Sequence, residues 1–167
     1  MDFQFTGLLV LLHVLFASAW FGGAAYQARV IGPALMAAGP SGMGFVLTLA
    51  RRRGIGWFFA LAGAMTILFG GWLYGKEQVY SAAFEGRNLW LTLGALLALG
   101  AYGHGLAVNM PTEKKWLAVC NSVKGTPTPE QGKLIAEYGA KLGKASIMGA
   151  AMVGVAMLLM LMSRVLA

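Results

Sequence analysis

The chain has 167 residues, of which 58% are apolar and only 11% are charged. A soluble domain carries about 25% charged residues, so this composition excludes that class and indicates an integral membrane protein. The single cysteine, Cys120, excludes an intramolecular disulfide and a cysteine-based metal cluster.

Four apolar runs are long enough to cross a bilayer, which takes roughly 20 residues each. They cover residues 6–31, 55–75, 89–110 and 145–165. With their connecting loops, these runs occupy the whole chain. We therefore expect a single membrane domain, residues 1–167, that folds as an all-α bundle of four transmembrane helices.

Two prolines are expected to mark helix ends. The first helix should end at Gly32-Pro33 and the third at Met110-Pro111, because proline disfavours a continued helix. Residues 34–49 should then lie along the membrane interface and lead to the cluster Arg51, Arg52 and Arg53, which would meet anionic headgroups. From Pro129 the helical pattern runs into the last span as one long helix.

The basic residues are distributed unevenly among the connections. The first connection carries Arg29 and the cluster at residues 51–53 with no acidic residue, and the third carries six lysines against three glutamates. Positively charged loops face the cytoplasm, so both termini should lie outside. This sidedness accounts for the net charge of +7 without a nucleic acid partner.

The two histidines, His13 and His104, both lie inside apolar runs. An ionisable side chain in hydrocarbon is costly and marks a functional-site hypothesis. Helical spacing puts His13 on one face with Ala17 and Trp20, and Gly100 and Ala101 share the face of His104. Such faces suit a flat macrocycle, but a histidine that merely hydrogen-bonds a carbonyl explains the same pattern.

The depths of the two histidines limit a simple haem model. His13 lies in the outer half of its span and His104 in the inner half of its own, roughly 14 Å apart at 1.5 Å per residue. Two ligands of one iron would share a depth, so the registers are shifted, the sites are separate, or one histidine is no ligand. Methionine is an alternative axial ligand. Methionines at suitable depths are Met157 and Met160 for His13, and Met148 and Met152 for His104.

Glycines recur in the spans. In the second span Gly56, Gly63 and Gly70 follow one another every seven residues. Small residues allow helix backbones to approach closely in a bilayer. This spacing predicts tight helix packing.

The motif His13-x6-Trp20-Phe21-Gly22-Gly23, followed by Tyr26 and Arg29, resembles the first helix of a superfamily of small four-helix bacterial membrane proteins. The superfamily includes HemJ-type protoporphyrinogen oxidases, CopD-type copper-resistance proteins and the membrane portion of cytochrome-linked urate oxidases. The likeness extends to Gly70-Gly71-Trp72, Tyr102-x-His104 and Pro111.

The resemblance implies a bacterial inner-membrane, multi-pass protein that binds haem b. In the HemJ-like branch the first-helix histidine is implicated in haem binding, so His13 and His104 become candidate metal ligands. The lysine that this branch requires in the third helix has no counterpart here, where the span begins Leu89-Trp90-Leu91-Thr92-Leu93.

The expected function is cytochrome b-like electron transfer or membrane oxidoreduction. Trp20 would line the pocket, His104 would be a second ligand or a second site, and Arg29 would pair with a haem propionate or simply extend to the interface. Expected partners are the lipid bilayer, a redox partner or larger membrane complex, and a second copy of the chain. The alternatives are a cofactor-free accessory subunit and a CopD-like copper-related protein.

Overall fold

The computed structural model describes residues 2–38, 42, 44–45, 48 and 54–165. Within these residues the regular elements are all helices. Four helical segments are long and apolar enough to cross a membrane: Gln4–Leu35, Gly56–Lys76, Gly86–Ser122 and Pro129–Val165. The predicted all-α fold with four membrane-spanning segments is confirmed. The cluster at residues 51–53 and much of the expected interfacial segment lie outside the described residues.

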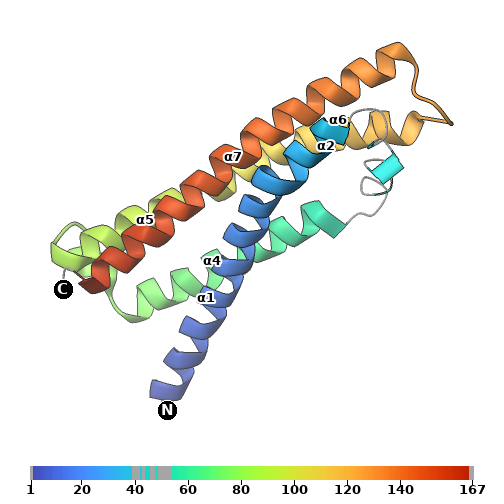
Figure 1. The fold of residues 1–167 in the computed structure, drawn as a ribbon. Coiled ribbons are helices and arrows are strands. Elements are labelled where there is room, and N and C mark those ends of the chain that lie inside the picture. The colour runs from blue at the N-terminus through green and yellow to red at the C-terminus, as the bar shows by residue number, and fades with distance from the viewer. Residues whose placement is uncertain (1, 39–41, 43, 46–47, 49–53, 166–167) are drawn as a thin grey trace.

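The elements follow one another as an up-and-down bundle (Figure 1). Both chain ends lie at one end of the bundle, and the turn between α6 and α7 lies at the other. The elements are α1 (Asp2–Tyr26), η1 (Gln27–Ile31), α2 (Gly32–Ala38), α4 (Gly54–Lys76), η3 (Val79–Ala82), α5 (Gly86–His104), η4 (Gly105–Asn109), α6 (Met110–Ser122) and α7 (Pro129–Val165).

The helices pass through both prolines instead of ending there, so those two predicted boundaries are wrong. At each site the chain widens into a π-turn: the Gly32 amide donates to the Gln27 carbonyl, and the Met110 amide donates to the Gly105 carbonyl. A proline ring clashes with the carbonyl four residues before it, and a local π-turn is one adjustment that accommodates a proline in a membrane helix. The helix therefore continues into α2 and α6.

Two antiparallel pairs make up the bundle. α1 packs mainly on α4 and α5 packs mainly on α7, while α1 also contacts α7 and α4 also contacts α5. The predicted face of α1 is confirmed, since Ala17, Trp20 and Ala24 are buried. Trp20 forms the central core with residues from the three other spans, namely Ala62, Ala101 and Val153.

One end of the bundle extends beyond a bilayer. The segments Gly86–Ser122 and Pro129–Val165 each contain 37 residues. At 1.5 Å per residue each is about 55 Å long, against roughly 30 Å of hydrocarbon. The protruding parts of α6 and α7 pack on a second core of Cys120, Val123 and Ile135. The long last helix predicted from Pro129 is confirmed.

Substitution of Gly63 tests how far the stability of the bundle depends on the close approach of its helices. A Cβ atom at Gly63 would lie 2.7 Å from the Tyr102 ring, whereas one at Gly71 would meet nothing within 4 Å. We expect Gly63→Leu to destabilise the protein by about 1–3 kcal/mol through overpacking and Gly71→Leu, on the same helix, to have little effect. Thermal unfolding of both variants in detergent measures the difference. Equal Tm values would contradict this account of the packing.

Candidate functional site

One face of α4 packs against side chains from three other helices. Its glycine row, Gly56, Gly63 and Gly70, has the seven-residue spacing that the sequence showed. A Cβ atom at these positions would lie 2.7 Å from Glu113 Oε2, from the Tyr102 ring and from His13 Cε1, respectively. Any larger residue would therefore push the partner side chain away.

His13 is half-buried between α1 and α4, with its ring on Gly70. Its Nδ1 lies 2.9 Å from the Thr66 carbonyl oxygen. A carbonyl only accepts, so Nδ1 carries the hydrogen and donates it, and Nε2 keeps a free lone pair. Metal-binding histidines are commonly oriented by this kind of bond from the other ring nitrogen to a carbonyl.

The local sequence of α4 prepares this bond. The Thr66 hydroxyl donates to the Ala62 carbonyl at 2.7 Å, so the side chain is satisfied within its own helix. The Thr66 carbonyl has two lone pairs and can accept from the imidazole as well as from the helix. Because Gly70 lies one turn further on, the ring can reach this carbonyl.

Trp20 lies deeper in the bundle than His13. Its ring meets the Tyr102 ring edge to face, with centroids 6.1 Å apart and planes at 87°. Trp20 is seven residues after His13, roughly 10 Å along the helix. The structure therefore places Trp20 in the central core and not against the His13 ring.

His104 lies on the other helix pair, between α5 and α7. Its Nε2 is 3.3 Å from the Ala145 carbonyl oxygen and donates to it, which leaves the lone pair on Nδ1. The rings of Trp20 and Tyr102 are in contact, so these two residues lie at the same height along the bundle axis. His13 precedes Trp20 by seven residues, and His104 follows Tyr102 by two. The histidines are thus roughly 14 Å apart along the bundle, so the structure does not bring them to one site.

The remaining predicted residues are dispersed. Arg29 is exposed in η1, sixteen residues from His13 and roughly 24 Å along the helix. Met160 packs on Gly94 between α5 and α7. Met152 packs against Gly100 between the same two helices, while Met148 is exposed. In the described part of the chain, no group of three or more His, Cys, Asp or Glu side chains could hold a metal ion.

Thr66 is the site residue that the sequence did not single out, whereas Gly70 and Tyr102 appeared only in the glycine spacing or in the family resemblance. The seven-residue glycine spacing was the available signal for Gly70. It predicted close packing, but it could not show that a histidine is the group packed there. That pairing depends on the register between α1 and α4.

The two hydrogen bonds predict opposite tautomers for the uncharged rings. We expect hydrogen on Nδ1 of His13 and on Nε2 of His104, because each faces a carbonyl. Nitrogen-15 NMR of protein labelled at histidine distinguishes the tautomers, and His13→Gln assigns the signals. The reverse tautomer at His13 would contradict the site geometry.

Models of protein families, curated proteins and solved structures gave no match to the chain.

Proposed function

We propose that this chain is a haem b-binding integral membrane protein for electron transfer or membrane-bound oxidoreduction, with Nε2 of His13 as an axial ligand. The observation that carries the proposal is the hydrogen bond from Nδ1 of His13 to the Thr66 carbonyl. It selects the tautomer whose Nε2 lone pair suits iron. It also fixes the ring direction.

The packing of His13 on α4 supports the proposal. Gly70 gives the ring its place, because a Cβ atom there would lie 2.9 Å from Nδ1. The ring is held by contacts with α4, so its orientation does not depend on the group that it would bind. Bound haem would supply one-electron chemistry, while the chain would supply orientation and an apolar environment.

His104 is not the second axial ligand in this proposal. It lies between α5 and α7, roughly 14 Å along the bundle from His13, so the two rings do not reach one iron. Arg29 is likewise too far along the helix to pair with a propionate of a haem held by His13. A haem at His13 would therefore have one histidine ligand from this chain.

Histidine substitutions separate the two roles. We expect purified protein to show a Soret band that His13→Ala abolishes, because iron loses its ligand, and that His104→Ala leaves in place. Absorption spectra of reduced and oxidised protein, with haem quantified per chain, measure this. Gly70→Val, which displaces the ring without removing it, should lower haem content as well.

The opposite results discriminate between candidate functions. A haem-free wild-type protein that copurifies with stoichiometric partners would contradict the proposal and favour a cofactor-free accessory subunit. A Soret band that survives His13→Ala but not His104→Ala would move the ligand to the α5–α7 seam. Circular dichroism of each variant checks that the helices have formed.

We also propose that the protein lies in a bacterial cytoplasmic membrane with both termini outside. Support comes from the lysines of α6 and α7, which lie at the end of the bundle opposite the termini (Figure 1). Basic residues are retained on the cytoplasmic side.

Cysteine labelling tests this orientation. In a Cys120→Ser background, Glu85→Cys lies between α4 and α5, and Lys124→Cys lies between α6 and α7. Both positions are exposed. A membrane-impermeant maleimide should label residue 85 in spheroplasts and residue 124 only after lysis. The reverse pattern would overturn the proposed sidedness.

A further inference from the structure

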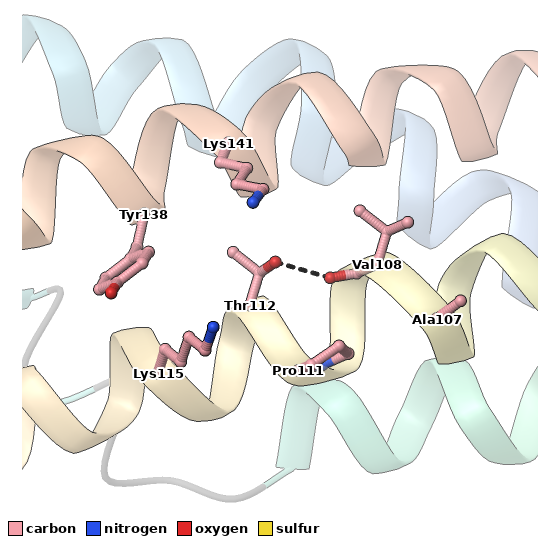
Figure 2. A pocket seen from close by; sticks show the side chains of 7 residues that line it. All are labelled: Ala107, Val108, Pro111, Thr112, Lys115, Tyr138 and Lys141. Carbon is pink, nitrogen blue, oxygen red and sulfur yellow. Dashed lines mark hydrogen bonds between the residues drawn. The ribbon is translucent and has the colours of Figure 1, made fainter.

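A pocket of about 420 Å³ lies between α6 and α7, and neither histidine is among its lining residues (Figure 2). It opens beside the π-turn η4, where Pro111 interrupts regular α-helical hydrogen bonding. Residues from η4, α6 and α7 surround it: Val108, Pro111, Thr112, Lys115, Tyr138 and Lys141.

The pocket gathers positive charge and hydroxyl groups. Lys115 extends from α6 and Lys141 from α7 into the same space, with Thr112 between them and Tyr138 at the edge (Figure 2). The Thr112 hydroxyl donates to the Val108 carbonyl at 2.7 Å, which leaves its oxygen able to accept. Among the described residues, the structure records no ion pair for either lysine.

Lys115 and Lys141 are both exposed, and two ammonium groups that line one pocket attract an anion. Lysine is a common binder of phosphate groups, which it contacts as a point charge. The Tyr138 hydroxyl can add a neutral hydrogen bond to the same oxygen atoms. The chemistry of the pocket therefore favours a phosphate group over a neutral ligand.

The depth of the pocket matches that of lipid headgroups. Lys141 lies one turn before Ala145, where the predicted apolar run of α7 begins. On the other side, Pro111 and Thr112 directly follow the apolar run that ends at residue 110. Basic pockets between transmembrane helices at this level are typical sites for anionic headgroups.

We propose that the α6–α7 pocket binds a phosphate group through Lys115 and Lys141, from an anionic lipid or from free phosphate. This site goes beyond the proposed haem function and is independent of it. The haem proposal concerns the α1–α4 seam, whereas the pocket lies between α6 and α7. The site can be tested by measuring lipid or phosphate binding, without any haem absorption.

Native mass spectrometry of the full chain in detergent tests the site, with phosphatidylglycerol as the probe and phosphatidylcholine as the neutral comparison. We expect the double variant Lys115→Gln/Lys141→Gln to bind phosphatidylglycerol about 30-fold more weakly, from the loss of two charges near the surface. The variant Lys115→Arg/Lys141→Arg should retain binding. Circular dichroism verifies that each variant is folded.

A matched control removes the same charge elsewhere on the same helices. Lys114 and Lys133 are exposed on α6 and α7, as Lys115 and Lys141 are, but they do not line the pocket. Lys114→Gln/Lys133→Gln should therefore bind phosphatidylglycerol like the wild type. An equal loss in this control, or full binding by Lys115→Gln/Lys141→Gln, would overturn the proposal.

Inorganic phosphate distinguishes the two sources. Calorimetric titration of lipid-depleted protein with phosphate should give binding that Lys115→Gln/Lys141→Gln abolishes if free phosphate is the ligand. Binding of phosphatidylglycerol without binding of inorganic phosphate identifies a lipid. Both results support the site, and binding of neither probe by the wild-type protein contradicts it.

Discussion

The close approach of other helices to the glycine row of α4 is the constraint on which the bundle depends. In lipid the hydrophobic effect does not press helices together, so contact depends on close packing and on polar interactions. At each glycine of the row a Cβ atom would lie within 2.7 Å of a partner atom. The same row thus sets the positions of His13 near one end, Tyr102 in the middle and Glu113 near the other.

The His13 contact shows how packing and chemistry are joined. An imidazole between membrane helices needs a hydrogen-bond partner, and the Thr66 carbonyl provides one without leaving its own helix. This bond satisfies one ring nitrogen and leaves the other as a lone pair. The interaction that makes the ring tolerable in the bundle is therefore also the one that would orient it as a ligand.

The sequence predicted the features that depend on composition and period. Apolar runs located the four spans, and helical spacing located the buried face of α1. The helix ends at Pro33 and Pro111 were predicted wrongly, because the rule that proline ends a helix does not allow for π-turns inside a membrane bundle. Which side chain packs on Gly70 depends on the register between α1 and α4. The residue spacing within a single helix does not specify that register.

The two helix pairs divide the molecule into two chemical regions. His13 belongs to the α1–α4 pair, whereas His104 and the lysine pocket belong to α5, α6 and α7. Lys141 lies one turn from Ala145, whose carbonyl accepts from His104. A phosphate group between Lys115 and Lys141 would restrain this turn of α7, and it would act on His104 before it acted on His13.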